Sequence, residues 1–264
     1  MSEQEIKSFD IKYELMRPWT DILLRTKLPD FILQKMIEIS DEIVGDPAKT
    51  PWGKNLAGQI ADEPLVPHEI LKRENVFGFF CNMIKEYVNQ CQIQQATIEF
   101  QNEMKKEKDN WQIEMKSWWV IEQRPGEYNP IHVHTDCDVS TVMYLKVPEF
   151  LPSEKPERND DGSIMFVGDA GIQTKLKRGI IKIHPHPGEF YIFPAHMLHT
   201  VYPYRTNDDF NRRSIAFNAS FTHADKSVAD WAIGREIPPH LKNPKGQGEA
   251  IGPPVHDVVT LRGS

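Results

Sequence analysis

The sequence predicts a mainly β protein, a sandwich or barrel of the jelly-roll kind, with helices flanking the β core. From about Trp111 the chain shows short β-like runs separated by segments rich in Pro, Gly, Asn or Asp. No helical pattern interrupts these runs, so they do not indicate the alternating strands and helices of a parallel α/β sheet. The first hundred residues read mainly as helix. The predicted strands cover 117–122, 139–147, 163–167, 179–183, 189–193, 196–202 and 212–221.

Two amphipathic stretches account for most of the helical part. The segment 28–44 opens with Pro29 and Asp30 and carries one apolar stripe at helical spacing, the packing face of a helix. A second stripe predicts a helix between about Pro67 and Gln92. The Pro- and Gly-containing segment 45–55 predicts a loop between them. The two stripes consist of Ile32, Met36, Ile39 and Ile43, and of Phe77, Phe80, Ile84 and Val88.

The 264 residues suit a single domain, 1–264, in three parts. We expect a helical N-terminal part over 1–110 and a jelly-roll core over 111–222. A C-terminal extension over 223–264 would hold one short helix near 229–237 and a Pro- and Gly-rich tail. The N-terminal helices, the loop 149–162 and the tail are expected to shape the entrance to any site in the core.

Composition and charge exclude several classes of protein. The formal net charge is −7, and the 31 Lys and Arg are scattered among 38 Asp and Glu, so no nucleic-acid partner is expected. No apolar run is long enough for a membrane span and no targeting segment is evident. The three cysteines fit free thiols in a reducing, cytoplasmic setting. Nucleotide and serine-hydrolase chemistry have no support, because GxGxxG, GxxxxGK[ST] and GxSxG are all absent.

Histidines gather in the predicted β core, where six of the ten fall between residues 132 and 199. On a strand, His134 and Asp136 would point to one face, as two ligands of one metal require. His199 follows 63 residues later at the start of another predicted strand. Two histidines and one carboxylate form the facial triad of non-haem Fe(II) oxygenases. His132 shares the parity of His134, so an HxH pair is a competing source of ligands.

A buried cation is predicted 13 residues after His199. Arg212 and Ser214 share one face of a strand, and a guanidinium with a hydroxyl can bind the far carboxylate of a dicarboxylate co-substrate. Arg213 would point the opposite way, although a register shift of one residue would exchange the two arginines.

Four segments carry a resemblance to a known family. SWWVIEQRPGEYNPIHVH, VMYLKVP, GEFYIFPAHMLHTVYP and RRSIAFN, within about residues 111–222, resemble the bacterial and phage branch of the Fe(II)/2-oxoglutarate oxygenases that is related to prolyl hydroxylases. The resemblance implies a double-stranded β-helix. It implies His134, Asp136 and His199 as catalytic iron ligands. It also implies Arg212 and Ser214 as the 2-oxoglutarate clamp, with Tyr144 binding the same carboxylate.

The expected function follows from the resemblance. It implies Fe(II), 2-oxoglutarate and O2 as cofactors, and hydroxylation of an unactivated C–H bond with release of succinate and CO2. The substrate would be a small molecule or a peptidyl residue, and the oligomeric state is left open. Two alternatives are a non-catalytic jelly-roll binding module and a cupin-like metalloenzyme that uses His132, His134 and His199 without 2-oxoglutarate.

Overall fold

The computed structural model describes residues 10–14, 21–95, 105–106, 108–153, 155, 159–168, 179–224 and 258–262. The chain separates into two compact units. The core unit comprises Asp21–Tyr87 and Ile113–Phe221, and the terminal unit comprises Met1–Thr20, Val88–Gln112 and Thr222–Ser264. The predicted helix near 229–237 and most of the predicted tail lie outside the described residues. The three-part division of a single domain stays a prediction.

In the terminal unit, β1 (Asp10–Glu14) pairs antiparallel with β11 (Val258–Arg262), a pairing that the sequence did not indicate. The unit also holds the end of α3 and the short 3-10 helix η2 (Lys108–Asn110).

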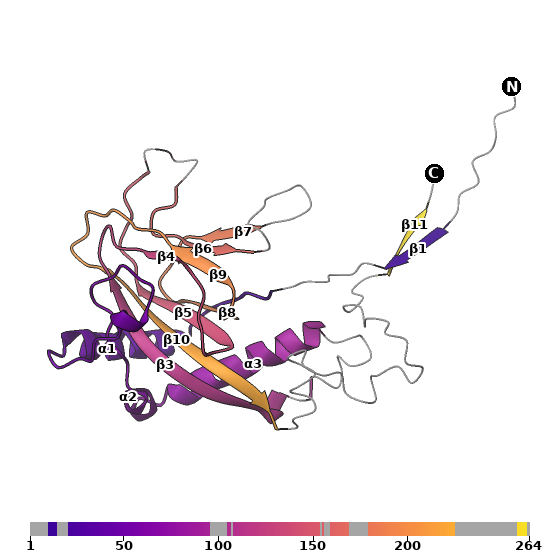
Figure 1. Cartoon of the computed structure of the whole chain (residues 1–264), viewed down its shortest axis with the longest axis horizontal. Coiled ribbons are helices and arrows are strands. Elements are labelled where there is room, and N and C mark those ends of the chain that lie inside the picture. Colours follow the sequence, from indigo (N-terminus) through magenta and orange to yellow (C-terminus); the bar gives the residue numbers. More distant parts are fainter. Residues whose placement is uncertain are drawn as a thin grey trace, which may run out of the picture. The chain divides into compact units, whose positions relative to one another are not determined.

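Nine strands, β2 to β10, form two antiparallel sheets (Figure 1). The five-stranded sheet has the order β2-β8-β5-β10-β3, and the four-stranded sheet has the order β4-β9-β6-β7. From β3 to β10, consecutive strands alternate between the sheets except at the β6–β7 hairpin, and this winding defines the double-stranded β-helix that the sequence predicts. The strands are β2 (Leu24–Lys27), β3 (Trp111–Gln123), β4 (Asn129–His132), β5 (Val139–Lys146), β6 (Ile164–Val167), β7 (Ile180–Ile183), β8 (Glu189–Pro194), β9 (Leu198–Val201) and β10 (Arg212–His223).

Helices cover the outer face of the five-stranded sheet (Figure 1). These are α1 (Asp30–Gly45), α2 (His68–Arg73) and α3 (Phe77–Gln95), with the short 3-10 helix η1 (Gly53–Asn55) in the loop between α1 and α2. The whole predicted stripe of α1 is buried. On α3, Phe80 packs edge-on against Trp118, Phe190 and Phe217 of the sheet. The outer face is therefore closed by aromatic packing.

The second predicted helix is two helices in the structure. Asn75, between α2 and α3, has a φ of 58°, a left-handed conformation that ends a helix. Asn tolerates this conformation better than most residues, so the chain can turn here. Among the described residues no helix is long and apolar enough to span a membrane.

The inner face of the five-stranded sheet packs against the four-stranded sheet. Their shared core draws on β5, β6, β8 and β9, and its buried residues are Val142, Tyr144, Ile164, Phe166, Tyr191, Phe193, Met197 and Val201. Side chains that alternate along β3, β5 and β10 therefore point either to the helices or into the space between the sheets. The candidate site lies in that space.

Candidate metal centre

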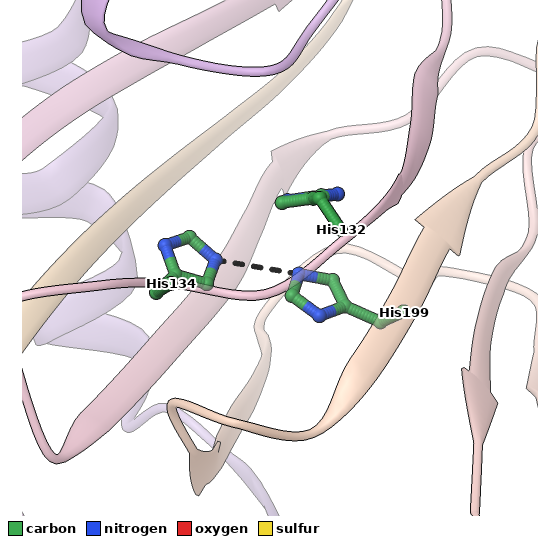
Figure 2. Close-up of side chains that lie close together, drawn as sticks. All are labelled: His132, His134 and His199. Atoms are coloured by element: carbon green, nitrogen blue, oxygen red, sulfur yellow. Dashed lines mark hydrogen bonds between the residues drawn. The ribbon is translucent and has the colours of Figure 1, made fainter.

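Three histidines meet between the sheets (Figure 2). His132 is the last residue of β4 and pairs directly with His199 on β9. His134 follows two residues later, outside the strand. One ring nitrogen of each residue lies within 4.8 Å of the others, and Nε2 of His134 lies 3.3 Å from Nε2 of His199. Three imidazoles thus converge on a point that could hold a metal ion.

Backbone carbonyls fix the orientation of two rings. Nδ1 of His132 donates to the carbonyl of Pro130 at 2.7 Å, and Nδ1 of His199 donates to the carbonyl of Met197 at 2.9 Å. A proton held on Nδ1 leaves Nε2 with a free lone pair, the form that ligates a metal. The backbone N–H of His134 donates to the carbonyl of Ala195 at 2.9 Å, and this bond fixes the loop that carries His134.

Burial keeps these imidazoles neutral. It lowers the pKa of His134 to about 3, helped by the nearby charges of His199 and His132. It lowers the pKa of His199 to about 4, and it also lowers the pKa of His132. Metal ligation needs the neutral imidazole, so the site is in its binding form at neutral pH.

Asp136 lies on the lining of the same cavity but is not one of the three grouped ligands. The expectation that His134 and Asp136 share a strand face is wrong, because β4 ends at His132. Asp136 instead lies in the loop before β5 with a φ of 58°. Its assignment as an iron ligand stays a prediction.

A cavity of about 420 Å³ opens beside the histidines. Its volume falls within the range of small-molecule sites. Trp119 lines it, with its ring centroid 6.1 Å from that of His134, whereas the neighbouring Trp118 stacks on Phe217 in the outer core. Because side chains alternate along β3, Trp119 faces the cavity and Trp118 packs in the outer core.

Arg212 points inward, as the strand parity predicts. Its side chain is only 2% exposed; Nη1 donates to the carbonyl of Gly162 at 2.5 Å and Nη2 donates to Oε1 of Gln123. The guanidinium carbon lies 5.7 Å from the ring centroid of Tyr144 and 5.8 Å from that of Tyr204. The guanidinium is therefore enclosed between β10, β3 and two aromatic rings.

Arg213 points outward and serves packing. Its Nε donates to Oε2 of Glu122 at 2.5 Å, and its Nη1 donates to Asp41 on α1. The two arginines therefore have separate surroundings, and only Arg212 lies on the inner side of the sheet.

Two buried polar atoms, Nε of Arg212 and the hydroxyl of the nearby Tyr144, lack a hydrogen-bond partner among the described residues. Burial raises the pKa of Tyr144 to about 12, so its hydroxyl remains a donor. Ser214 is buried and pairs with Tyr144 across the β10–β5 register. Unpaired buried donors are costly, and a carboxylate ligand would satisfy both. Tyr144 belongs to the same core cluster as Val142 and Val201, which line the cavity.

Glu63 and Trp52 also line the cavity, and no sequence pattern indicated either of them as a site residue. Both come from the segment between α1 and α2, far from the histidines in sequence. The loop prediction for 45–55 includes Trp52, but nothing in the local pattern indicates that a loop carboxylate such as Glu63 is buried.

The sequence of the β core matches a known family. Residues 117–218 match the sequence model of the family described as "Putative 2OG-Fe(II) oxygenase", a range that runs from β3 to β10. The match covers less than half of the chain, and it shows what this part of the sequence is similar to. The description of that family names Fe(II) and 2-oxoglutarate, and the three grouped histidines of this chain could hold a metal ion.

Solved structures that resemble this chain share little sequence with it. A Pseudomonas putida prolyl-4-hydroxylase is 13% identical, with 76% of this chain and 92% of that chain covered and a TM-score of 0.44. A Trichoplax adhaerens prolyl hydroxylase, in complex with a hypoxia inducible factor peptide fragment, is 10% identical, with coverage of 75% and 82% and a TM-score of 0.46. An oxidoreductase of the 2OG-Fe(II) oxygenase family from Burkholderia pseudomallei is 14% identical, with 41% of this chain and only 45% of that chain covered and a TM-score of 0.30. No curated protein matches the chain in sequence.

Proposed function

We propose that the chain is a non-haem Fe(II)- and 2-oxoglutarate-dependent dioxygenase that hydroxylates an unactivated C–H bond, with release of succinate and CO2. The observation that carries this proposal is the placement of three neutral histidines, one buried and two half-buried, in the same barrel interior as a buried arginine whose surroundings hold unpaired donors. The first group suits a metal with open positions, and the second suits a dicarboxylate.

We assign His134 and His199 as two of the iron ligands. His132 is the third candidate by proximity, since its ring centroid lies 4.2 Å from that of His199. Asp136 is the third candidate by sequence spacing and lines the same cavity. Either set leaves positions open for a co-substrate, which a closed four-ligand site does not.

Arg212, Tyr144 and Ser214 are proposed to hold the far carboxylate of 2-oxoglutarate. The guanidinium offers a charge-assisted contact, and the Tyr144 hydroxyl adds a neutral donor. Gly162 and Gln123 hold the guanidinium in place before the ligand arrives. When bound, iron and 2-oxoglutarate supply the oxidative chemistry, and the chain contributes orientation and a cavity shielded from bulk water.

The substrate is proposed to be a small molecule or one side chain of a peptide. The cavity of about 420 Å³ accommodates either beside the histidines.

Uncoupled turnover tests the proposal. We expect protein supplied with Fe(II), 2-oxoglutarate and air to form succinate slowly without any added substrate, and NMR to detect it. Arg212→Met should raise the KM for 2-oxoglutarate roughly tenfold or more, since it removes a charged hydrogen bond. The control Arg73→Met, on an exposed ion pair with Glu42, should leave that KM unchanged.

The grouping of three histidines without a carboxylate favours one alternative, the cupin-like metalloenzyme. That enzyme would not need a dicarboxylate clamp. Absence of succinate in the iron-loaded protein, or turnover that Arg212→Met does not affect, would reject the oxygenase and favour this alternative.

A further inference from the structure

The cavity has a second polar feature on the segment 62–66, which runs beside β3 as an additional edge of the five-stranded sheet. The N–H of Val120 donates to the carbonyl of Pro64, and the N–H of Glu122 donates to the carbonyl of Asp62, at 2.9 and 3.0 Å. These two bonds place Glu63 beside Ile121. Because Ile121 lines the cavity, the register brings Glu63 to the same inner face.

Two tryptophans of the cavity lining, Trp52 and Trp119, lie on the segments next to Glu63. Trp52 lies opposite Glu63 on the neighbouring segment, since the N–H of Trp52 donates to the carbonyl of Glu63 at 2.8 Å. Trp119 lies on β3, where it forms an antiparallel bridge with Leu65, two residues after Glu63. Trp52 and Trp119 also pack in one apolar cluster. We call Trp52, Glu63 and Trp119 the acidic corner.

The carboxylate of the acidic corner is uncompensated. Glu63 is only 4% exposed, and its Oε2 has no hydrogen-bond partner among the described residues. Burial, with the nearby charge of Glu127, raises the pKa of Glu63 to about 7. The cavity lining includes one lysine, Lys116, which is already paired with Glu114 at 2.6 Å. A buried carboxylate without a cation is costly, so this arrangement is suited to a cation that arrives with a ligand.

We propose that the acidic corner binds a positively charged nitrogen, an ammonium or a guanidinium, of the substrate that is oxidised. The carboxylate supplies the charge-assisted hydrogen bond, and Trp52 and Trp119 supply aromatic surface in the same cavity lining, which favours a cation. Gly53 and Gly58 are built closely around the carboxylate: a Cβ on either would lie 3.2 or 3.3 Å from its oxygens. The assignment of this ligand as the substrate rests on the proposed oxygenase function.

Calorimetry on the metal-free protein tests the proposal independently of turnover. The probes are Nα-acetyl-lysine methylamide and its uncharged counterpart Nα-acetyl-norleucine methylamide. We expect the lysine probe to bind on the order of tenfold more tightly than the norleucine probe. Glu63→Gln keeps the size of the side chain and should reduce this preference to about twofold or less, whereas Glu149→Gln, at an exposed position outside the cavity lining, should preserve it.

Equal affinity for the two probes, absence of binding by both at millimolar concentration, or a preference that survives Glu63→Gln would each overturn the proposal. Because the comparison of the two probes uses the wild-type protein, the proposal stays testable even where the variant folds poorly. Failure of the oxygenase assignment would appear separately, as a lack of succinate formation in a protein that still prefers the lysine probe.

Discussion

Single side chains divide the barrel interior into a neutral and a charged part. His199 is buried and His134 is half-buried, and both are neutral, while Arg212 carries its charge 13 residues after His199. His199 contacts His134 through Nε2, and its ring packs against the rings of Phe166 and Phe193.

Removal of a proposed ligand should weaken metal binding. His134→Ala and His199→Ala are each expected to lower the affinity for Co²⁺, a stable substitute for Fe(II), on the order of a hundredfold, since each leaves two ligands. The control is His196→Ala, because His196 is exposed and paired with Asp21 at 3.0 Å. Isothermal titration checks the affinities, and equal affinities in all three variants would contradict the site.

The third ligand is decided by a second pair of variants. His132→Ala should lower the Co²⁺ affinity as much as His199→Ala, because His132 lies within the group of converging nitrogens. Asp136→Ala should change it by less than about threefold. The opposite ranking would restore the carboxylate that the sequence spacing indicates.

Glu63 should make stability depend on pH. Its pKa is raised from 4.5 to about 7 in the folded protein, so the folded state binds more protons between these values than the unfolded state does. Stability contributed by this group is therefore lost as the pH rises through about 4.5 to 7, by about 1–3 kcal/mol. Urea denaturation should show wild type losing stability relative to Glu63→Gln between pH 5 and pH 8, and a constant difference would show that Glu63 is ionised throughout.

At the scale of elements, β10 connects the site with the helical layer. Alternate residues point to opposite sides, so Arg212 enters the barrel while Arg213 reaches Glu122 and Asp41 on the outer side. This division could be predicted from the sequence, because strand alternation has a fixed period of two. The place of Asp136 could not, because the same rule holds only while the strand continues and β4 ends at His132.

Loss of Arg213 should destabilise the fold without affecting co-substrate binding. Arg213→Met leaves the buried carboxylate of Glu122 without its cation, which should cost about 2–4 kcal/mol of unfolding free energy. Lys146→Met removes a more exposed partner of Asp41, at 2.6 Å, and should cost less than about 1 kcal/mol. Urea denaturation measures both variants, and equal costs would mean that the Glu122 pair contributes little.

At the scale of the whole molecule, the β core was more predictable than its surroundings. Each predicted strand from 117 to 221 overlaps a strand of the structure, because short apolar runs between turn residues carry a local signal, whereas β4 lies in no predicted strand. The burial of Glu63 carries no such signal, since it depends on contacts between segments that are distant in the sequence. The resemblance of the core motifs, and not the composition, indicated the cofactors.

Anaerobic absorption spectroscopy tests the central claim most directly. Addition of Fe(II) and 2-oxoglutarate to the protein without oxygen should produce the visible metal-to-ligand charge-transfer band of the chelate. The band should be absent in His199→Ala and should require more 2-oxoglutarate in Arg212→Met. A folded, iron-loaded wild-type protein that gives no band at saturating 2-oxoglutarate would contradict the assignment of this chain as a 2-oxoglutarate oxygenase.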